Sequence, residues 1–419
     1  MNILLKSAKI IAPSNPSIHQ KKRDILIKNG VIEKIAANIE SPKNSKEIKR
    51  NNLHVSVGWF DTGISFGEPG HEERETISDG LQVAAKSGFT DVLLNPNGSP
   101  VPDSGSDIVF LKDRAKNLTT NLYPIGALTV KSEGIALAEV FDMQTKGAVG
   151  FYDYKSPITN SNLLKIALLY TQNFDGLVFS FPQDPSIKGK GIVNEGENST
   201  KLGLKGIPAL SEELQVARDL FILEYTGGKL HIPTVSSAGV VKLIAEAKKK
   251  GLDVTASVAV HNLRLTDTEL ETFDTNFKVN PPLRTKKDSK ALVKALLNGT
   301  IDFVTTDHRP MDIEEKRVEF DNAAYGSIGL ESAFGALNHL LNLDETILLL
   351  TKGRERFGIS VPKIEEGSKA NLTLFNPDGT TIFSEEQVLS KSKNAIFFNK
   401  EVKGTVYGVI NNDKMSVNG

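Results

Sequence analysis

The sequence predicts an α/β protein: a (β/α)8 barrel of the TIM type, with a small β-sandwich domain built from both ends of the chain. Two observations carry this prediction. In the middle of the chain, short apolar runs typical of strands alternate with segments of helical periodicity. At both ends, strand-like runs and turn signals occur without such helices. We expect the two ends, 1–57 and 361–419, to form one domain around the barrel at 58–360.

The ends of the chain contain the clearest turn signals. Residues 24–28 and 31–35 flank Asn29-Gly30, the dipeptide that type I′ hairpin turns favour. Further strand-like runs occupy 370–375 and 404–410, close to the C-terminus. We therefore predict that strands from both ends share one β domain.

The middle of the chain contains eight strand-like runs separated by helical segments. These runs lie near 57–62, 90–95, 122–128, 147–152, 176–181, 229–234, 252–260 and 301–306. One of the helices shows the pattern well, because Ser236-Ser237 can cap it, apolar residues recur at helical spacing, and Gly251 ends it. An open doubly wound sheet is the alternative, but no Gly-rich phosphate loop follows the first strand.

Composition excludes several classes of function. The 50 basic residues almost balance the 51 acidic residues, so nothing predicts a nucleic-acid or membrane-surface partner. Cysteine is absent, which excludes disulfides, thiolate nucleophiles and Cys-ligated metals. No apolar run approaches the ~20 residues that span a bilayer, and the N-terminus does not resemble a signal peptide. We expect a cytoplasmic globular protein.

Histidine is scarce, with seven in the whole chain. No two are separated by one residue, or by three residues within a helix, which are spacings typical of a metal site. Residue spacing alone therefore does not predict a metal centre. His231 and His261 are expected to be satisfied interior histidines.

In a barrel, functional groups gather where the strands end. The segments at these ends occur in a distinctive order. They include Glu68-Pro69-Gly70, Asn95-Pro96-Asn97, Asn280-Pro281-Pro282-Leu283-Arg284, Asp307-His308, Glu314-Glu315-Lys316 and Gly329-Leu330-Glu331. Over the whole chain, they resemble the dihydroorotases of the amidohydrolase superfamily. Taken on its own, Glu314-Glu315-Lys316 is typical of a solvated loop or helix face.

The resemblance implies an activity and a cofactor. Dihydroorotases reversibly interconvert dihydroorotate and carbamoyl aspartate, and they hold zinc at the barrel mouth with four histidines and aspartates. Zinc lowers the pKa of bound water from about 15.7 to about 7 and polarises the carbonyl. The family also commonly forms homodimers, so the resemblance implies a dimer.

Position by position, the resemblance implies that the zinc-binding histidines are missing. The His-x-His pair after the first strand corresponds to Gly63 and Ser65. The histidines after the fifth and sixth strands correspond to Phe181 and Thr234. We expect Phe181 to fill the emptied metal pocket. The chain is thus expected to be a divergent homologue without bound zinc.

Two aspartates and part of the substrate site remain. The aspartates are Asp153 and Asp307, the latter at the family's base position, here expected to be vestigial; without imidazoles, the two should not hold zinc tightly. Gly67 and Met311 replace the arginine and histidine that contact the substrate, and the two substrate-binding asparagines are retained. The retained asparagines are Asn97 and Asn280.

Each retained residue also has a structural interpretation. Asn97 and Asn280 lie beside prolines, where amide side chains often satisfy local backbone groups. Asp153 is expected to be structural, because a general base needs an activated substrate beside it. Asp307-His308 is expected to anchor a loop, with a catalytic relic and a weak metal site as the alternatives.

Three hypotheses for the function follow from the resemblance. The leading one is an inactive dihydroorotase-like protein of pyrimidine biosynthesis, acting as a structural or regulatory partner of aspartate transcarbamoylase. The alternative is an active dihydroorotase or cyclic amidase with a degenerate metal site. A third is a sensor that binds a pyrimidine precursor through Asn97 and Asn280.

Overall fold

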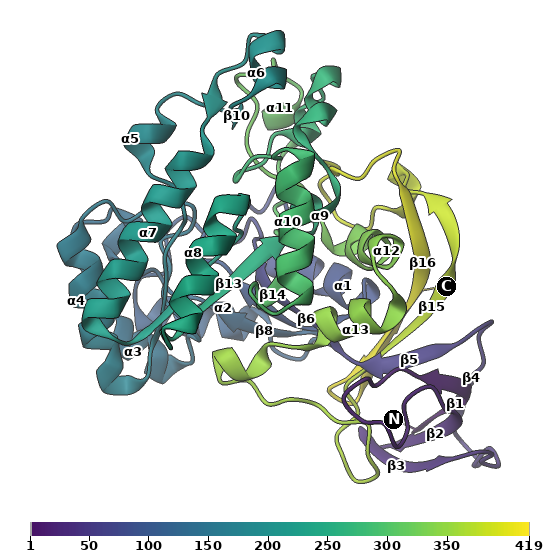
Figure 1. Ribbon diagram of the computed structural model, residues 1–419. Helices are drawn as coiled ribbons and strands as arrows, with labels where there is room; N and C mark the ends of the chain where they lie inside the picture. Colours follow the sequence, from purple (N-terminus) through teal and green to yellow (C-terminus); the bar gives the residue numbers. More distant parts are fainter. Residues whose placement is uncertain (1, 419) are drawn as a thin grey trace.

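The computed structural model describes residues 2–418, which form a barrel flanked by a sheet domain that contains both ends of the chain (Figure 1). The sheet has the order β17-β16-β15-β5-β1-β2-β3, and β4 also pairs with β1. Its strands are β1 (Asn2–Ile10), β2 (Lys22–Lys28), β3 (Val31–Ala36), β4 (Lys46–Ile48), β5 (His54–Val57), β15 (Leu372–Ile382), β16 (Glu401–Asn411) and β17 (Lys414–Val417).

The two ends of the chain join at the centre of this sheet. Strand β5 pairs antiparallel with β15, where Val57 faces Leu372 and His54 faces Phe375. The prediction of one β domain from both ends is confirmed. The predicted sandwich differs in one respect, because hydrogen bonds connect all eight strands into one continuous sheet. Strand β1 makes this possible, since along its length it pairs with β2, β4 and β5.

The predicted hairpin connects β2 and β3. Asn29 and Gly30 have φ angles of 49° and 73°, the left-handed values that a type I′ turn requires. Apolar side chains from both ends of the chain pack into the core beneath the sheet. They include Ile3, Ile25, Val55, Leu372 and Ile410.

Seven strands and one isolated bridge surround the barrel axis. The strands are β6 (Trp59–Ile64), β7 (Phe89–Leu94), β8 (Asn121–Pro124), β9 (Leu177–Phe179), β12 (Lys229–Ile232), β13 (Val254–Ala259) and β14 (Phe303–Thr305). Phe151 bridges Gly126 and Val178, in the fourth-strand position predicted near 147–152. Thr305 Oγ1 donates to the carbonyl of Gly63 over 2.9 Å and links β14 back to β6. The predicted eightfold barrel is confirmed.

Helices cover the barrel in the order that the periodicity predicts. The longer ones are α1 (Ile77–Lys86), α2 (Gly105–Arg114), α3 (Val140–Lys146), α4 (Ser161–Thr171), α7 (Ala209–Thr226), α8 (Ala238–Lys249), α10 (Lys286–Leu297), α12 (Leu330–Leu340) and α13 (Leu343–Thr351). Short elements are α5 (Pro185–Lys188), β10 (Val193–Asn194), α6 (Glu197–Leu202), β11 (Gly206–Ile207), α9 (Val260–Arg264) and α11 (Ile313–Lys316). Ser237 caps α8 by accepting from the Val240 amide, as expected.

Residues at the start of β6 hold the barrel against the sheet domain. The Trp59 ring stacks on Phe334 of α12 at 4.8 Å, and its Nε1 donates to Ser56 Oγ of β5 over 3.0 Å. Nearby, the fully buried Arg354 donates to Asp91 Oδ2 of β7 and to the carbonyl of Gly58. One aromatic stack and one buried ion pair therefore fix this end of the barrel.

None of the helices within residues 2–418 combines the length and the apolar character needed to cross a membrane.

Candidate functional site

A small cavity lies at the barrel mouth, where β6, β12, β13 and β14 end. Side chains from most of the strand ends line it: Thr62, Gly63, Asn95, Tyr152, Tyr154, Lys155, Phe179, Pro233, Thr234, Ser257, Thr305 and Asp307. Its volume is about 10 Å³, close to the ~10–15 Å³ that one water molecule occupies. Typical ligand pockets measure about 300–1,000 Å³. The side chains therefore nearly fill the mouth.

An ion pair occupies the centre of this mouth. Lys155 Nζ lies 2.9 Å from Asp307 Oδ2, and the two side chains are 8% and 5% exposed. The Lys155 ammonium also lies 5.4 Å from the centre of the Tyr154 ring. Lys155 follows the fourth-strand position by four residues, so the chain leaving Phe151 carries it into the mouth. Lys155 is not predicted as a site residue from the sequence, although its place two residues after Asp153 is an available signal.

Only two of the four positions where the resemblance implies histidine ligands share an environment. Gly63 and Thr234 line the mouth cavity. Ser65 is buried, and its amide donates to the carbonyl of His308 over 2.8 Å. Phe181 is buried in an aromatic cluster that also contains Phe179. Within residues 2–418, no three His, Asp or Glu side chains come together in a way that could hold a metal ion.

Asp153 accepts hydrogen bonds from the backbone of a neighbouring loop. Its Oδ1 accepts from the amides of Leu128 and Thr129 at 3.0 and 2.9 Å, and its Oδ2 accepts from Thr129 Oγ1. Burial raises the pKa of Asp153 above its ordinary value, although these hydrogen bonds oppose the shift. The structural role expected for Asp153 agrees with these contacts.

The four substrate positions do not converge on the cavity. A Cβ atom at Gly67 would lie 1.8 Å from the carbonyl oxygen of His71, so this loop conformation cannot hold a side chain there. Met311 is buried, and its amide donates to Asn394 Oδ1. Asn97 Nδ2 donates to the carbonyl of Phe66 over 2.6 Å, and Asn280 Oδ1 accepts from Gln183 Nε2 over 3.0 Å. Both retained asparagines thus bond within the chain.

The mouth retains backbone strain and unpaired polar atoms. Thr234 and Asp307 have φ angles of 51° and 48°, an unusual conformation for a β-branched residue such as Thr234. Thr62 Oγ1, Thr234 Oγ1 and Tyr154 Oη are buried without a hydrogen-bond partner in residues 2–418. Such features cluster at functional sites, where the fold holds side chains in unfavourable positions.

His308 forms a buried pair beside the mouth. Its Nε2 lies 2.9 Å from Glu75 Oε2, and its Nδ1 accepts from the amide of Gly329. Burial alone would lower the pKa of His308, but the hydrogen bond and charge of Glu75 outweigh it and raise the pKa. His308 thus makes the contacts of a loop anchor, whereas Asp307 pairs with Lys155 instead.

The Glu75–His308 pair predicts a pH dependence. A raised histidine pKa adds stability that is complete below the unfolded-state value of about 6.5 and is lost as the pH rises through the folded-state value. Replacing Glu75 by glutamine should therefore lower the free energy of unfolding more at pH 6 than at pH 9. Urea unfolding of both proteins at the two pH values measures this difference. An equal loss at both would contradict the protonated pair.

The two histidines expected to be satisfied in the interior, His231 and His261, differ from each other. His231 lies within hydrogen-bond distance of Thr255 and Ser257, and burial lowers its pKa well below the ordinary value. His261 is buried, which lowers its pKa to about 4, and its Nε2 has no hydrogen-bond partner among the described residues. The expectation of satisfied histidines thus holds for His231 but is wrong for one ring nitrogen of His261.

Comparison with known proteins places these observations in a family. Residues 54–239 match the family described as dihydro-orotase-like, and residues 209–415 match the amidohydrolase family. A dihydroorotase from Pelotomaculum thermopropionicum is 39% identical over 98% of this chain and 97% of its own length. A dihydroorotase from Syntrophus aciditrophicus is 38% identical over 97% of both chains.

Solved structures support the fold. The L-hydantoinase (dihydropyrimidinase) of Arthrobacter aurescens superposes with a TM-score of 0.84 at 20% identity, covering 99% of this chain and 95% of its own. A D-hydantoinase from a Thermus species gives a TM-score of 0.82 at 21% identity, covering 99% of this chain and 95% of its own. Both share the barrel with its sheet domain.

Proposed function

Because this chain belongs to the dihydroorotase family of amidohydrolases, we propose that it keeps the family fold without the family chemistry. In this proposal, the chain acts as a structural or regulatory partner in pyrimidine biosynthesis. A barrel of this kind would be stable, and its outer surface, shared with the family, could bind other proteins.

The Lys155–Asp307 pair in a nearly filled mouth is the observation that carries the proposal. An ammonium group already neutralises Asp307, so a metal cation there would be repelled by Lys155 and would have to displace it. Asp153, the second carboxylate, is saturated by the loop at 128–129. The residues present do not fit zinc, because zinc sites in proteins need three or four N, O or S ligands.

The substrate side of the mouth supports the same proposal. The substrate carboxylate would need a bidentate cation such as arginine, but Gly67 stands at that position and has no room for a side chain. The two asparagines have intramolecular partners. A cyclic amide substrate would therefore have no cation to bind its carboxylate and too little room in the mouth cavity.

An active dihydroorotase or related cyclic amidase is the second candidate. The names of the relatives favour it over the first, since proteins called dihydroorotase match almost the whole chain at 37–39% identity. The strained Thr234 and the unpaired hydroxyl groups of Thr62 and Tyr154 also suit a site that meets a ligand. This candidate requires Lys155 to leave Asp307 and open the mouth.

The decisive experiment is a turnover assay. Carbamoyl aspartate cyclisation and dihydroorotate opening should be followed at high protein concentration, with and without added zinc. We expect no turnover above buffer in either condition. Asp307→Ala, prepared identically, serves as the control, because a contaminating host enzyme would give equal rates in both preparations. Zinc-dependent turnover that Asp307→Ala abolishes would overturn the proposal and establish the active enzyme.

Aspartate transcarbamoylase is the proposed partner. The support is the resemblance to the dihydroorotases, which implies this preceding enzyme of the pathway as a partner. The transcarbamoylase of the same organism should co-elute with this chain in size-exclusion chromatography with light scattering. The chain alone, run in parallel, tests the expected homodimer. Independent elution of the two proteins at micromolar concentration would rule this partner out.

A further inference from the structure

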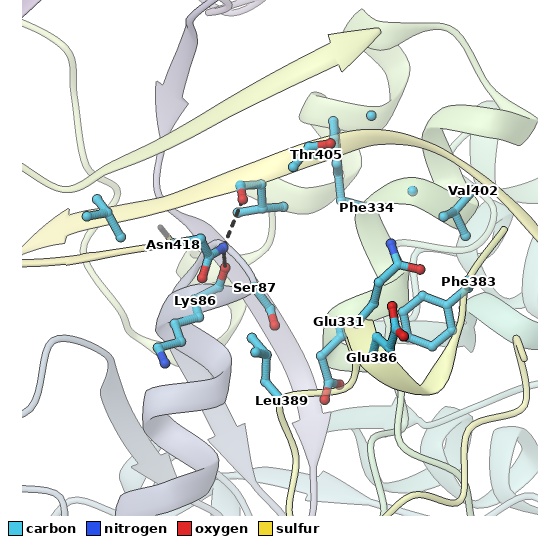
Figure 2. A pocket seen from close by; sticks show the side chains of 15 residues that line it. Lys86, Ser87, Glu331, Phe334, Phe383, Glu386, Leu389, Val402, Thr405 and Asn418 are labelled. Carbon is cyan, nitrogen blue, oxygen red and sulfur yellow. Dashed lines mark hydrogen bonds between the residues drawn. The ribbon is translucent and has the colours of Figure 1, made fainter. Parts of the chain in front are cut away.

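A larger cavity, separate from the one at the barrel mouth, lies between the sheet domain and the helices. We call it the α1–β16 pocket, since the end of α1, the start of α12 and strand β16 form its walls. Its volume is about 430 Å³, within the ~300–1,000 Å³ range of small-molecule sites. Figure 2 shows Lys86, Ser87 and Asn418 on one side and Glu331, Glu386 and Phe383 on the other. The barrel-mouth residues do not line it.

Apolar side chains form much of this pocket. Three buried side chains line the cavity: Phe334 of α12, Val402 of β16, and Phe383, which follows β15. The half-exposed Leu389 lines it as well. Phenyl rings in the lining favour a flat apolar group, because aromatic rings gain additional energy from stacking or edge contacts. The α1–β16 pocket is therefore suited to a ligand with an apolar, ring-like portion.

Two polar atoms in the same pocket lack partners. Ser87 is 4% exposed, and its Oγ has no hydrogen-bond partner in residues 2–418. Glu331 uses one carboxylate oxygen, Oε1, to accept from the amide of Ser390 over 2.9 Å. Its other oxygen, Oε2, is buried and also without a partner in that part of the chain. Leaving a buried carboxylate oxygen unpaired is costly, so a donor group is expected opposite it.

The charge of the walls indicates which donor fits. A carboxylate accepts hydrogen bonds only, and an ionised donor makes the stronger bond. Glu386 adds a second carboxylate at the rim. Among residues 2–418, Lys86 is the one basic residue that lines the pocket, and Figure 2 shows its ammonium group directed away from Glu331. An anionic ligand would meet two carboxylates, whereas a cationic ligand would be attracted.

We propose that the α1–β16 pocket binds a small organic ammonium compound that carries an aromatic ring. Its ammonium group donates to Glu331 Oε2 and to Ser87 Oγ, and its ring packs against Phe334 and Phe383. The proposal goes beyond the proposed function and is independent of it, because no mouth residue takes part. It assigns a ligand class to a site that connects the barrel helices with β16.

Phenethylammonium is a suitable probe, with the uncharged phenethyl alcohol as its matched control. Isothermal titration calorimetry on the full chain should show one site for the ammonium compound, with a dissociation constant of about 1 mM or below. The alcohol should bind at least about tenfold more weakly, because hydrogen bonds between charged groups contribute about 1.4 kcal/mol or more, and that energy equals a factor of ten.

Two matched variants locate the site. Glu331→Gln removes the charge yet keeps an oxygen that can accept from Ser390, and it should weaken binding at least about tenfold. Glu386→Gln removes the same charge from the exposed rim and should change binding less than about twofold. Ser87→Ala leaves the hydrogen bond between Glu331 and Ser390 in place and should weaken binding about threefold. It provides the second test if Glu331→Gln fails to fold.

Three results would overturn the proposal. One is the absence of binding heat for phenethylammonium on folded wild-type protein. The second is equal affinity for the alcohol, which would mean that the ring alone binds. The third is an equal effect of Glu331→Gln and Glu386→Gln, since general attraction to acidic residues would then explain the binding.

Discussion

Replacing Arg354 by methionine is expected to lower the free energy of unfolding by about 3–5 kcal/mol, because it leaves a carboxylate buried without its partner. Arg354 is fully buried and donates to Asp91 Oδ2 over 2.7 Å and to the carbonyl of Gly58 over 2.8 Å. Its guanidinium also lies 5.2 Å from the Phe60 ring centre. Urea unfolding at pH 7 measures the loss.

The pH dependence of this loss identifies Asp91 as its source. Burial would raise the pKa of Asp91, but the charge of Arg354 and several hydrogen bonds outweigh it and lower the pKa. The stability from this ionised carboxylate is present above about pH 4, the unfolded-state pKa, and is lost as the pH falls through the folded-state value. The deficit of Arg354→Met should therefore shrink in acid.

A second variant provides the control for Arg354. Adding Asp91→Leu to Arg354→Met removes the unpaired carboxylate, and the double variant should recover part of the lost stability. A single variant within about 1 kcal/mol of the wild type would show that water reaches Asp91 and that the pair does not fix this end of the barrel.

Replacing Lys155 by methionine is the second change with a large expected effect. It should lower the free energy of unfolding by about 3 kcal/mol, because the buried Asp307 carboxylate at the barrel mouth would lose its ammonium partner. Asp307→Asn, added to Lys155→Met, removes the charge and should restore part of the stability. Asparagine suits this position, because Asp307 has a φ of 48° and asparagine tolerates that conformation.

An exposed pair offers the matched control for Lys155. Lys201 lies 3.1 Å from Glu271, but these side chains are 65% and 52% exposed. Lys201→Met should change the free energy of unfolding by less than about 1 kcal/mol, because water screens this pair. If urea unfolding gave the same small loss for both lysine variants, Lys155 would not be the element that closes the mouth.

Much of the fold could be predicted because its signals are local. The Asn29-Gly30 turn and the cap at Ser237 each depend on a few neighbouring residues, and both occur as expected. The approximate positions of the barrel strands could also be predicted from local signals, namely their short apolar runs. The single continuous sheet was not predicted, because the pairing of β1 with three other strands depends on contacts between distant parts of the chain.

The candidate site was harder to predict. The resemblance to a family predicts only the positions that bind metal or substrate in that family, and Lys155 is not one of them. Only the structure shows that Lys155 meets Asp307, 152 residues away in the chain. The expectation of a solvated Glu314-Glu315-Lys316 segment is wrong for Lys316. Its Nζ donates to the carbonyls of Ala324 and Gly326, and burial lowers its pKa to about 7.

The sheet domain has a consequence for folding during synthesis. Its central pairing joins β5, which ends at Val57, to β15, which begins at Leu372, 315 residues later. At about 5–20 residues per second, the ribosome needs roughly 15–60 s to bridge that interval. During this time the outer edge of β5 has no strand beside it, and an open edge can pair with other chains. A nascent chain of this protein is therefore expected to expose a pairing edge that the finished fold covers.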